Sequence, residues 1–260
     1  MNESLISMFD LTGTTAIVTG GSRGLGVSFA RGLLKAGCNV ALAARDLNGL
    51  TKIAEELKEL GPRVIPIRTD VRNAADVNSM VQRVFNEFGR IDTLVNNAGI
   101  SAVAPAEEMT PEQWQDVIDT NLTALFYCAQ CVGRHMLCAG SGRIINIASM
   151  YGFSGASYVP QVSYVTSKSG VLGFTRELAV QWGPRGVQVV ALAPGLFRSD
   201  QTIWALEGNK ELGEKLLAKV PMGRIGKLEE LEATIVYLAS AASGYMNGQA
   251  LVIDGGFLAW

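Results

Sequence analysis

One stretch of the sequence indicates the fold: Thr19-Gly20-Gly21-Ser22-Arg23-Gly24-Leu25-Gly26. It follows an apolar stretch, residues 15–18, and opens a helical pattern over residues 25–35, so it joins a strand to a helix. Gly20 allows a sharp turn, Gly24 lets backbone N–H groups approach a pyrophosphate, and Gly26 lets the helix press on the sheet. The stretch predicts a dinucleotide site, with a plain glycine-rich turn as the alternative.

Strand-like and helical patterns alternate along the whole chain. Short apolar strands are expected at residues 16–19, 40–43, 64–67, 93–95, 144–147, 187–192 and 250–253. Helices are expected at residues 25–36, 47–60, 74–88, 111–137, 162–182, 210–218 and 228–239. Thr110 and Gln113 form a capping box at the start of the helix at 111–137. Seven strands separated by helices predict an α/β fold, a doubly wound parallel sheet with helices on both faces.

Length and composition fit a single domain, residues 1–260. The chain has 260 residues, of which 48% are hydrophobic, which is enough for a full core. Its formal charge of −2 disfavours nucleic acid as a partner, and no charge-free apolar stretch long enough for a membrane span is present. Residues 1–12 do not resemble a secretory signal, so we expect a short N-terminal arm and a cytoplasmic location.

The cysteines and the histidine predict neither a disulfide nor a metal site. Cys128, Cys131 and Cys138 share one expected helix, and Cys38 follows another. No second paired set and no histidine cluster accompanies them, so buried or half-buried thiols are expected. His135 is the only histidine, and its isolation argues against histidine catalysis.

Acid/base chemistry is indicated beyond the fifth expected strand. Ser149 lies just past residues 143–148, at the edge where open α/β sheets bind ligands. Tyr164 and Lys168 are four residues apart on an expected helix, so they share a face. A lysine cation near a phenol lowers the pKa of the phenol and allows proton exchange near neutral pH. A surface Tyr/Lys pair is the alternative when these residues are considered alone.

Taken together, these motifs resemble the short-chain dehydrogenase/reductase family over essentially the whole chain. The matching motifs, in chain order, are the glycine stretch, Asp70-Val71, Asn96-Asn97-Ala98-Gly99, Asn121, Ser149, Tyr164-Val165-Thr166-Ser167-Lys168 and Pro194-Gly195. The resemblance implies a Rossmann fold and an NAD(P)-dependent oxidoreductase, which transfers a hydride between the nicotinamide and a secondary alcohol or ketone. It also implies a homotetramer, the common assembly in the family.

The resemblance assigns four catalytic roles. Tyr164 is the general acid/base, Ser149 hydrogen-bonds the reacting oxygen, and Lys168 holds the nicotinamide ribose while it depresses the pKa of Tyr164. Asn121 completes a water-linked proton relay, which would explain a poor helix former inside an expected helix. A polar residue on the solvent face of that helix is the alternative reading of Asn121.

Further family positions describe a cofactor cleft. Asp70 is implied to accept from the adenine amino group, with capping of the next helix as the alternative. The Phe197 backbone and the Ser199 hydroxyl are implied to hold the carboxamide, and Ser199 stands where the family usually has threonine. With the arginines discussed next, the expected cofactor contacts are Gly20, Ser22, Arg23, Gly24, Leu25, Gly26, Arg45, Asp70, Val71, Asn97, Ala98, Gly99, Tyr164, Lys168, Pro194, Gly195, Phe197 and Ser199.

Charge at the end of the second expected strand favours NADP over NAD. An enzyme that reads the unphosphorylated ribose usually has an acid at this point, whereas this chain has Arg45. Arg23 in the glycine stretch adds a second cation, and guanidinium groups bind phosphate through charge-assisted bonds. Asp46 keeps NAD open as the alternative, because it also lies close to the expected ribose site.

Two segments are expected to border the substrate. The loop 152–160 holds two residues more than the usual family spacing between Ser149 and Tyr164, and Met150, Tyr151 and Gln161 beside it are either wall or packing residues. Residues 196–226 are expected to form a lid, in which Trp204 and Leu206 exclude water. The charges within residues 210–219 fit a solvated helix face.

The lid and the C-terminal segment resemble sugar-acid and polyol dehydrogenases of the gluconate 5-dehydrogenase type. Reductases of 3-oxoacyl thioesters share most of these features, so they are the alternative. Two other classes of protein, a catalytically silent nucleotide-binding regulator and a methyltransferase, are disfavoured by the intact Ser/Tyr/Lys set.

A tetramer interface is expected on the helices at 111–137 and 162–182, whose apolar residues include Leu125, Phe126, Val171, Leu172 and Phe174.

Overall fold

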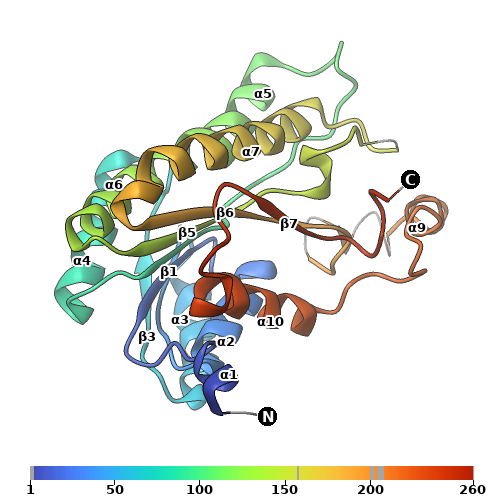
Figure 1. Ribbon diagram of the computed structural model, residues 1–260. Helices are drawn as coiled ribbons and strands as arrows, with labels where there is room; N and C mark the ends of the chain where they lie inside the picture. The colour runs from blue at the N-terminus through green and yellow to red at the C-terminus, as the bar shows by residue number, and fades with distance from the viewer. Residues whose placement is uncertain (1–2, 157, 200–201, 204–207, 260) are drawn as a thin grey trace.

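The protein contains one seven-stranded sheet in which all neighbouring strands are parallel (Figure 1). The computed structural model describes residues 3–156, 158–199, 202–203 and 208–259. The strands are β1 Thr15–Thr19, β2 Asn39–Ala44, β3 Val64–Arg68, β4 Thr93–Asn96, β5 Gly142–Ile147, β6 Val187–Pro194 and β7 Ala250–Ile253. All seven expected strands are confirmed, most of them extended by one or two residues.

Helices cover both faces of this sheet (Figure 1). They are α1 Glu3–Ser7, α2 Leu25–Lys35, α3 Leu47–Leu57, α4 Ala74–Phe88, α5 Pro111–Ile118, α6 Ala124–Ala139, α7 Val162–Trp182, α9 Lys210–Leu217 and α10 Leu228–Ala239. One buried cluster lies under α2, α3 and α10 and includes Phe29, Leu50 and Ile235. A second lies under α4, α6 and α7 and includes Val81 and Val132. The predicted doubly wound α/β fold is therefore confirmed.

The strand order β3-β2-β1-β4-β5-β6-β7 places the site. The chain builds outward from β1 to β3 on one side, then crosses back and builds outward from β4 to β7 on the other. The loops that leave the adjacent strands β1 and β4 consequently diverge to opposite faces of the sheet. A crevice opens between them at the carboxyl edge, which is where doubly wound sheets bind their ligands.

The expected helix at residues 111–137 is wrong as a single α-helix. The capping box of Thr110 and Gln113 is present, but α5 passes into a π-helical turn, η2 Asp119–Thr123, before α6 begins. Such turns insert one residue into the i→i−4 ladder and are frequent at functional sites. Asn121 lies in this turn and is buried.

Packing corrects two expectations about side chains on α6 and α7. Cys138 is exposed, because it follows Met136 by two residues and so leaves the buried stripe of Cys128, Val132 and Met136. Three residues expected on an exposed interface are instead buried, because α6 and α7 pack against each other and on β6: Leu125, Val171 and Leu172. Phe126 remains 43% exposed, and Phe174 is half-buried.

Among the described helices, none has the length and apolar character required to cross a membrane.

Candidate active site

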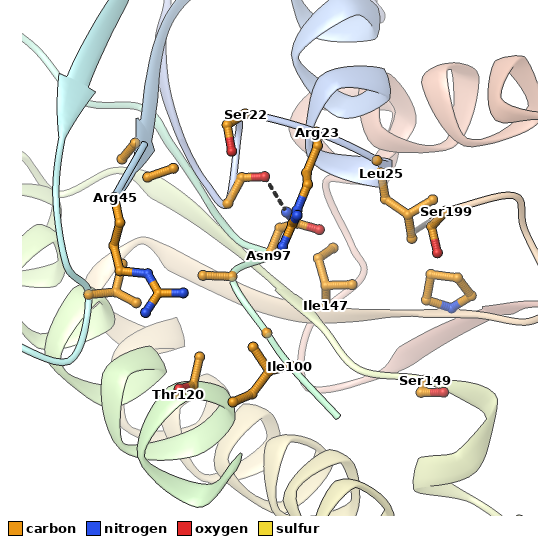
Figure 2. A pocket seen from close by; sticks show the side chains of 18 of the residues that line it. Ser22, Arg23, Leu25, Arg45, Asn97, Ile100, Thr120, Ile147, Ser149 and Ser199 are labelled. Atoms are coloured by element: carbon orange, nitrogen blue, oxygen red, sulfur yellow. Dashed lines mark hydrogen bonds between the residues drawn. The ribbon is translucent and has the colours of Figure 1, made fainter. Parts of the chain in front are cut away.

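A cleft of about 440 Å³ runs along the carboxyl ends of the strands (Figure 2). Its walls come from the loops that follow β1 to β6 and from the first turns of α7, and they include Ser149, Tyr164 and Lys168. Of the positions expected to contact a dinucleotide, every one except Gly26 lines this cleft. Residues separated by more than 150 positions in the sequence are thus brought to one site.

The glycine stretch has the geometry expected of a phosphate loop. Gly20 and Gly24 adopt positive φ angles of 65° and 58°, which side-chain-bearing residues rarely adopt. A Cβ atom on Gly26 would lie 2.3 Å from the carbonyl oxygen of Gly20, so only glycine lets α2 begin this close to the loop. Gly26 therefore shapes the cleft from behind without lining it, which agrees with the predicted role in helix packing.

The turn after β4 is tied to the glycine stretch. Asn97 Nδ2 donates to the backbone oxygens of Thr19, at 2.9 Å, and Gly20, at 3.2 Å. The backbone N–H groups of Asn97 and Ala98 donate to Thr19 Oγ1 at 3.0 and 3.1 Å. This segment is therefore both a structural turn and a wall of the cleft.

Two arginines extend into the cleft near its β2 end. Both line the pocket, and Figure 2 shows Arg45 entering it from the end of β2 and Arg23 entering it from the loop before α2, beside Asn97. Asp46 also lines the pocket, but its Oδ1 accepts from the backbone N–H of Gly49 at 3.1 Å and caps α3. The carboxylate that kept NAD open as an alternative is therefore engaged by its own helix.

Arg72 lines the cleft and was missed by the sequence analysis. Its Nη2 and Nε donate to the two carboxylate oxygens of Asp70 at 3.0 and 3.2 Å, and this pairing lowers the pKa of Asp70. Asn73, not Asp70, caps α4, so the alternative reading of Asp70 as a helix cap is wrong. A cation directly after the Asp70-Val71 motif was the available signal.

Ser149, Tyr164 and Lys168 meet at the β5 end of the cleft. Ser149 Oγ accepts from the backbone N–H of Tyr151 at 3.1 Å and begins the 3-10 helix η3 Met150–Gly152. The side chain of Ser149 also acts on Tyr164, whose pKa it lowers. Lys168 Nζ donates to the carbonyl oxygen of Ile147 at 2.7 Å and lies 5.7 Å from the centroid of the Tyr164 ring.

Burial controls the proton affinities at this end of the cleft. Burial raises the pKa of Tyr164, and the side chain of Ser149 only partly offsets this rise. Burial also lowers the pKa of Lys168 to about 8. The expected depression of the Tyr164 pKa by Lys168 is therefore not found, because removal of both groups from water favours their neutral forms.

Asn121 bridges the turn at Ile100 to α7. Its Oδ1 accepts from the backbone N–H of Ile100 at 2.8 Å, and its Nδ2 donates to the carbonyl oxygen of Ile100 at 2.9 Å and to Ser167 Oγ at 3.0 Å. These contacts hold the π-helical turn against the cleft wall. A Cβ atom on Gly99 would lie 3.2 Å from Asn121 Oδ1 and 3.6 Å from Lys168 Nζ, so Asn121 borders the lysine site although it does not line the cleft.

The loop after β6 is organised by Thr202, which the sequence analysis also missed. Thr202 Oγ1 donates to the carbonyl oxygen of Phe197 at 2.6 Å and accepts from the backbone N–H of Ser199 at 3.0 Å. Ser199 Oγ lies 3.1 Å from the same hydroxyl. All three residues line the cleft, so the expected carboxamide-binding groups are held in a fixed arrangement.

The segment 196–226 leaves and re-enters the fold at one place, because the backbone N–H of Gly226 donates to the carbonyl oxygen of Leu196 at 2.8 Å. Trp204 and Leu206, expected to exclude water, lie outside the described residues. Lys219 departs from the expected solvated face: it is half-buried, with Nζ 5.1 Å from the centroid of the Tyr158 ring. The other four charges are exposed: Lys210, Glu211, Glu214 and Lys215.

The candidate wall residues divide into two kinds. Met150 and Tyr151 are buried in a cluster with Leu216 and Phe257, against which Tyr164 packs. Gln161 is half-buried and forms an isolated parallel bridge with Ala104. Met150 thus has the character of a packing residue, whereas the phenol of Tyr151 adds a polar group near Tyr164.

The chain is similar to known dehydrogenases and reductases over nearly its full length. A family model described as short chain dehydrogenase matches residues 14–208, which contain every residue of the cleft. The chain is 38% identical to 2-dehydro-3-deoxy-D-gluconate 5-dehydrogenase of Escherichia coli (strain K12), over 98% of this chain and 99% of that protein. It is also 38% identical to the 3-oxoacyl-acyl-carrier-protein reductase of Chlamydia pneumoniae, over 95% and 97% of the two chains.

A solved structure shows the same likeness in three dimensions. The gluconate 5-dehydrogenase from Burkholderia cenocepacia J2315, in complex with NADP and tartrate, matches with a TM-score of 0.93 at 33% identity. The match covers 98% of this chain and 99% of that chain. The fold and nearly its whole length are thus shared with a dinucleotide-binding protein.

Proposed function

This chain belongs to the short chain dehydrogenase family, and we propose that it transfers a hydride between NADP(H) and a secondary alcohol or its ketone. The observation that carries the proposal is the convergence of Ser149, Tyr164 and Lys168 at the end of a cleft that begins with a phosphate-type glycine loop. A catalytically silent nucleotide-binding regulator would have no use for such a set.

The residues of this set have distinct proposed roles in reduction. A bound nicotinamide supplies the hydride at its C4. Ser149 holds the carbonyl oxygen, and Tyr164 donates the proton as that oxygen becomes a hydroxyl. Burial keeps Tyr164 protonated at neutral pH, which suits a proton donor. Lys168 holds the nicotinamide ribose, and Asn121 holds the wall beside it and links it to a proton relay.

We propose NADP as the preferred cofactor. Arg23 and Arg45 supply the charge that a 2′-phosphate requires, while Asp46 caps α3. Two similar solved structures, which are both described as containing NADP, support this choice. NAD is the alternative, and it becomes the better choice if the two arginines do not discriminate.

For the substrate, we propose a sugar acid, a polyol or another small carbonyl compound. The similarity to sugar-acid dehydrogenases of several bacteria supports this class. A 3-oxoacyl thioester is the second candidate, because reductases of that class are equally similar in sequence. Residues 196–226 would close over the nicotinamide end of the cleft, since the segment returns to Leu196 after its excursion.

We further propose a single oxidoreductase domain over residues 1–260, with residues 1–12 as an arm, in a homotetramer located in the cytoplasm. The continuous sheet supports one domain. The four cysteines, none of which forms a disulfide, are typical of a reducing compartment. Phe126 and Val180 are exposed on α6 and α7 and supply apolar surface for an interface.

A substrate panel with both cofactors tests the proposal. Oxidation of NADPH and of NADH is followed with keto sugars, 2-keto acids, diketones and acetoacetyl thioesters, for wild type and for the Arg23→Ala/Arg45→Ala double variant. We expect reduction of a small hydroxylated ketone with NADPH preferred. We also expect the double variant to lose about tenfold or more of that preference, because each charge-assisted contact contributes roughly 1.5–3 kcal/mol.

Arg185→Ala is the matched control, because Arg185 is exposed in η4 Gly183–Arg185, at the opposite end of β6 from the cleft. It should leave the cofactor preference unchanged. A wild type that prefers NADH, or a double variant that weakens both cofactors equally, would show that Asp46 reads the ribose. Reduction of acetoacetyl thioesters alone would favour the second substrate class.

A further inference from the structure

Tyr151 places a second phenol beside the reacting one. Its side chain is only 8% exposed, and its ring meets the Phe257 ring edge-on at a centroid distance of 6.0 Å. Tyr164 packs against the same apolar cluster. Burial raises the pKa of Tyr151, and the charge of Tyr164 contributes to this rise, in agreement with the packing of both residues at one cluster.

The Tyr151 hydroxyl has no hydrogen-bond partner among the described residues. Buried tyrosine hydroxyls usually find one, so this group stands out. The Tyr151 hydroxyl is not among the fully enclosed polar atoms without a partner, unlike Ser163 Oγ. Tyr151 itself stands behind the cleft wall that Ser149 and Tyr164 form, so only a ligand that extends past these two residues would reach its hydroxyl.

The backbone holds Tyr151 in a fixed position relative to Ser149 and Lys168. The N–H of Tyr151 donates to Ser149 Oγ at 3.1 Å, so the two side chains arise from one tight turn. Gly152 follows, and a Cβ atom there would lie 2.9 Å from the carbonyl oxygen of Lys168, which shows that η3 rests directly on α7. Ser169 Oγ donates to the carbonyl oxygen of Gly152 at 3.1 Å and closes this contact. Because its backbone is held this firmly, Tyr151 can favour ligands that have a polar atom at one particular position.

We propose that the Tyr151 hydroxyl binds a second substrate oxygen, on the carbon next to the reacting one, and so selects hydroxy ketones and vicinal diols over simple ketones. We choose the neighbouring carbon because Ser149 and Tyr164 hold the reacting oxygen in the proposed mechanism, Tyr151 leaves the same turn as Ser149, and Tyr164 packs against the cluster that contains Tyr151. Burial raises the pKa of Tyr151 to about 12, so its hydroxyl stays protonated and donates throughout the neutral range. This inference rests on the proposed function and narrows its substrate class.

The test compares acetoin with butan-2-one, which differ only in the hydroxyl beside the carbonyl group. We expect wild type with NADPH to prefer acetoin by about tenfold in kcat/KM, and Tyr151→Phe to reduce this preference to less than about twofold. In Tyr151→Phe, kcat/KM should decrease for acetoin and stay unchanged for butan-2-one. Tyr127→Phe is the matched control, because Tyr127 is a half-buried phenol on α6 that packs against a different buried cluster from the one that Tyr164 contacts, and it should keep the preference.

Stability separates substrate binding from a structural role. Because the Tyr151 hydroxyl has no protein partner, Tyr151→Phe should leave Tm unchanged or raise it slightly. A Tm lowered by several degrees would show that the hydroxyl is paired within the fold. Equal losses for acetoin and butan-2-one, or no loss for either, would also overturn the proposal.

A binding experiment keeps this inference distinct from the proposed function. Tartrate carries hydroxyls on adjacent carbons, and succinate is its counterpart without them. In the presence of NADP, wild type should bind tartrate more tightly than succinate, and Tyr151→Phe should bind the two equally. If wild type reduces no ketone, the proposed function fails, and this pair of affinities still decides the role of Tyr151. Equal affinities in wild type would overturn it.

Discussion

At the scale of single residues, proton affinity in the cleft is set by removal from water. Lys168 illustrates this, because burial lowers its pKa from the ordinary 10.5 to about 8 while its amine still donates to Ile147. Between these two values the unfolded chain binds a proton that the native protein does not. The stability of the native state should therefore rise with pH from about 8 to 10.5 through this residue, whereas below pH 8 the buried cation costs a constant amount.

Urea unfolding of the cofactor-free protein measures this dependence. From pH 7.5 to 9.5, the free energy of unfolding of wild type should gain roughly 1–2 kcal/mol relative to Lys168→Met, which has no proton to lose. Lys210→Met is the control, since Lys210 has a 91% exposed side chain on α9 and should show no such difference. Parallel pH profiles for wild type and Lys168→Met would contradict the burial argument.

The residues that sequence patterns predicted are those whose role follows from position along the chain. Tyr164 and Lys168 share a face because they are four residues apart, and Gly20 must turn because it ends a strand. Thr202 could not be predicted in the same way, because its role depends on contact with the Phe197 backbone in a loop without periodicity. The Tyr164 pKa was predicted wrongly, because a sequence shows the neighbouring charge but not the depth of burial.

At the scale of elements, the π-helical turn η2 is the feature that periodicity did not predict. An apolar repeat in the sequence identifies a helix but does not reveal that one residue is inserted into it. The hydrogen-bond partner of Asn121 could not be predicted either, because it is a backbone group 21 positions away. Asn121 was nevertheless identifiable as an unsuitable residue inside a helix. A poor helix former in an otherwise regular pattern thus indicated where the helix changes.

Asn121→Ala should destabilise the protein by about 2–4 kcal/mol, because it leaves both backbone groups of Ile100 without partners. Chemical denaturation measures the change. Gln130→Ala, an exposed substitution on α6, should remain within about 0.5 kcal/mol of wild type. An Asn121 variant as stable as wild type would show that the turn does not depend on this side chain.

At the scale of the whole molecule, the parallel sheet gathers the site. All strands point the same way, so each motif that follows a strand reaches the same edge, and this is why the sequence predicted most of the cleft. The outer surface was harder to predict. Leu125, Val171 and Leu172 have the composition of an interface, but the packing of α6 and α7 buries them within one chain.

The exposed apolar surface that remains on these helices leads to a prediction about assembly. Light scattering at micromolar concentration should give the mass of a tetramer, and Phe126→Glu should shift it to smaller species by burying a charge in the interface. Leu47→Glu is the control, because Leu47 is comparably exposed on α3, on the other face of the sheet, and should leave the mass unchanged. A monomeric wild type would reject the interface.

The most direct test of the account is the rate of Tyr164→Phe with NADPH and the best ketone from the panel. Loss of the proton donor should lower kcat by about 10²–10⁴, while the Kd for NADPH stays within about twofold of wild type, because the ring and Lys168 remain. Tyr245→Phe, at a fully exposed tyrosine, should retain wild-type turnover. A Tyr164 variant that keeps more than half of the wild-type kcat would contradict the assignment of this cleft as a tyrosine-dependent oxidoreductase site.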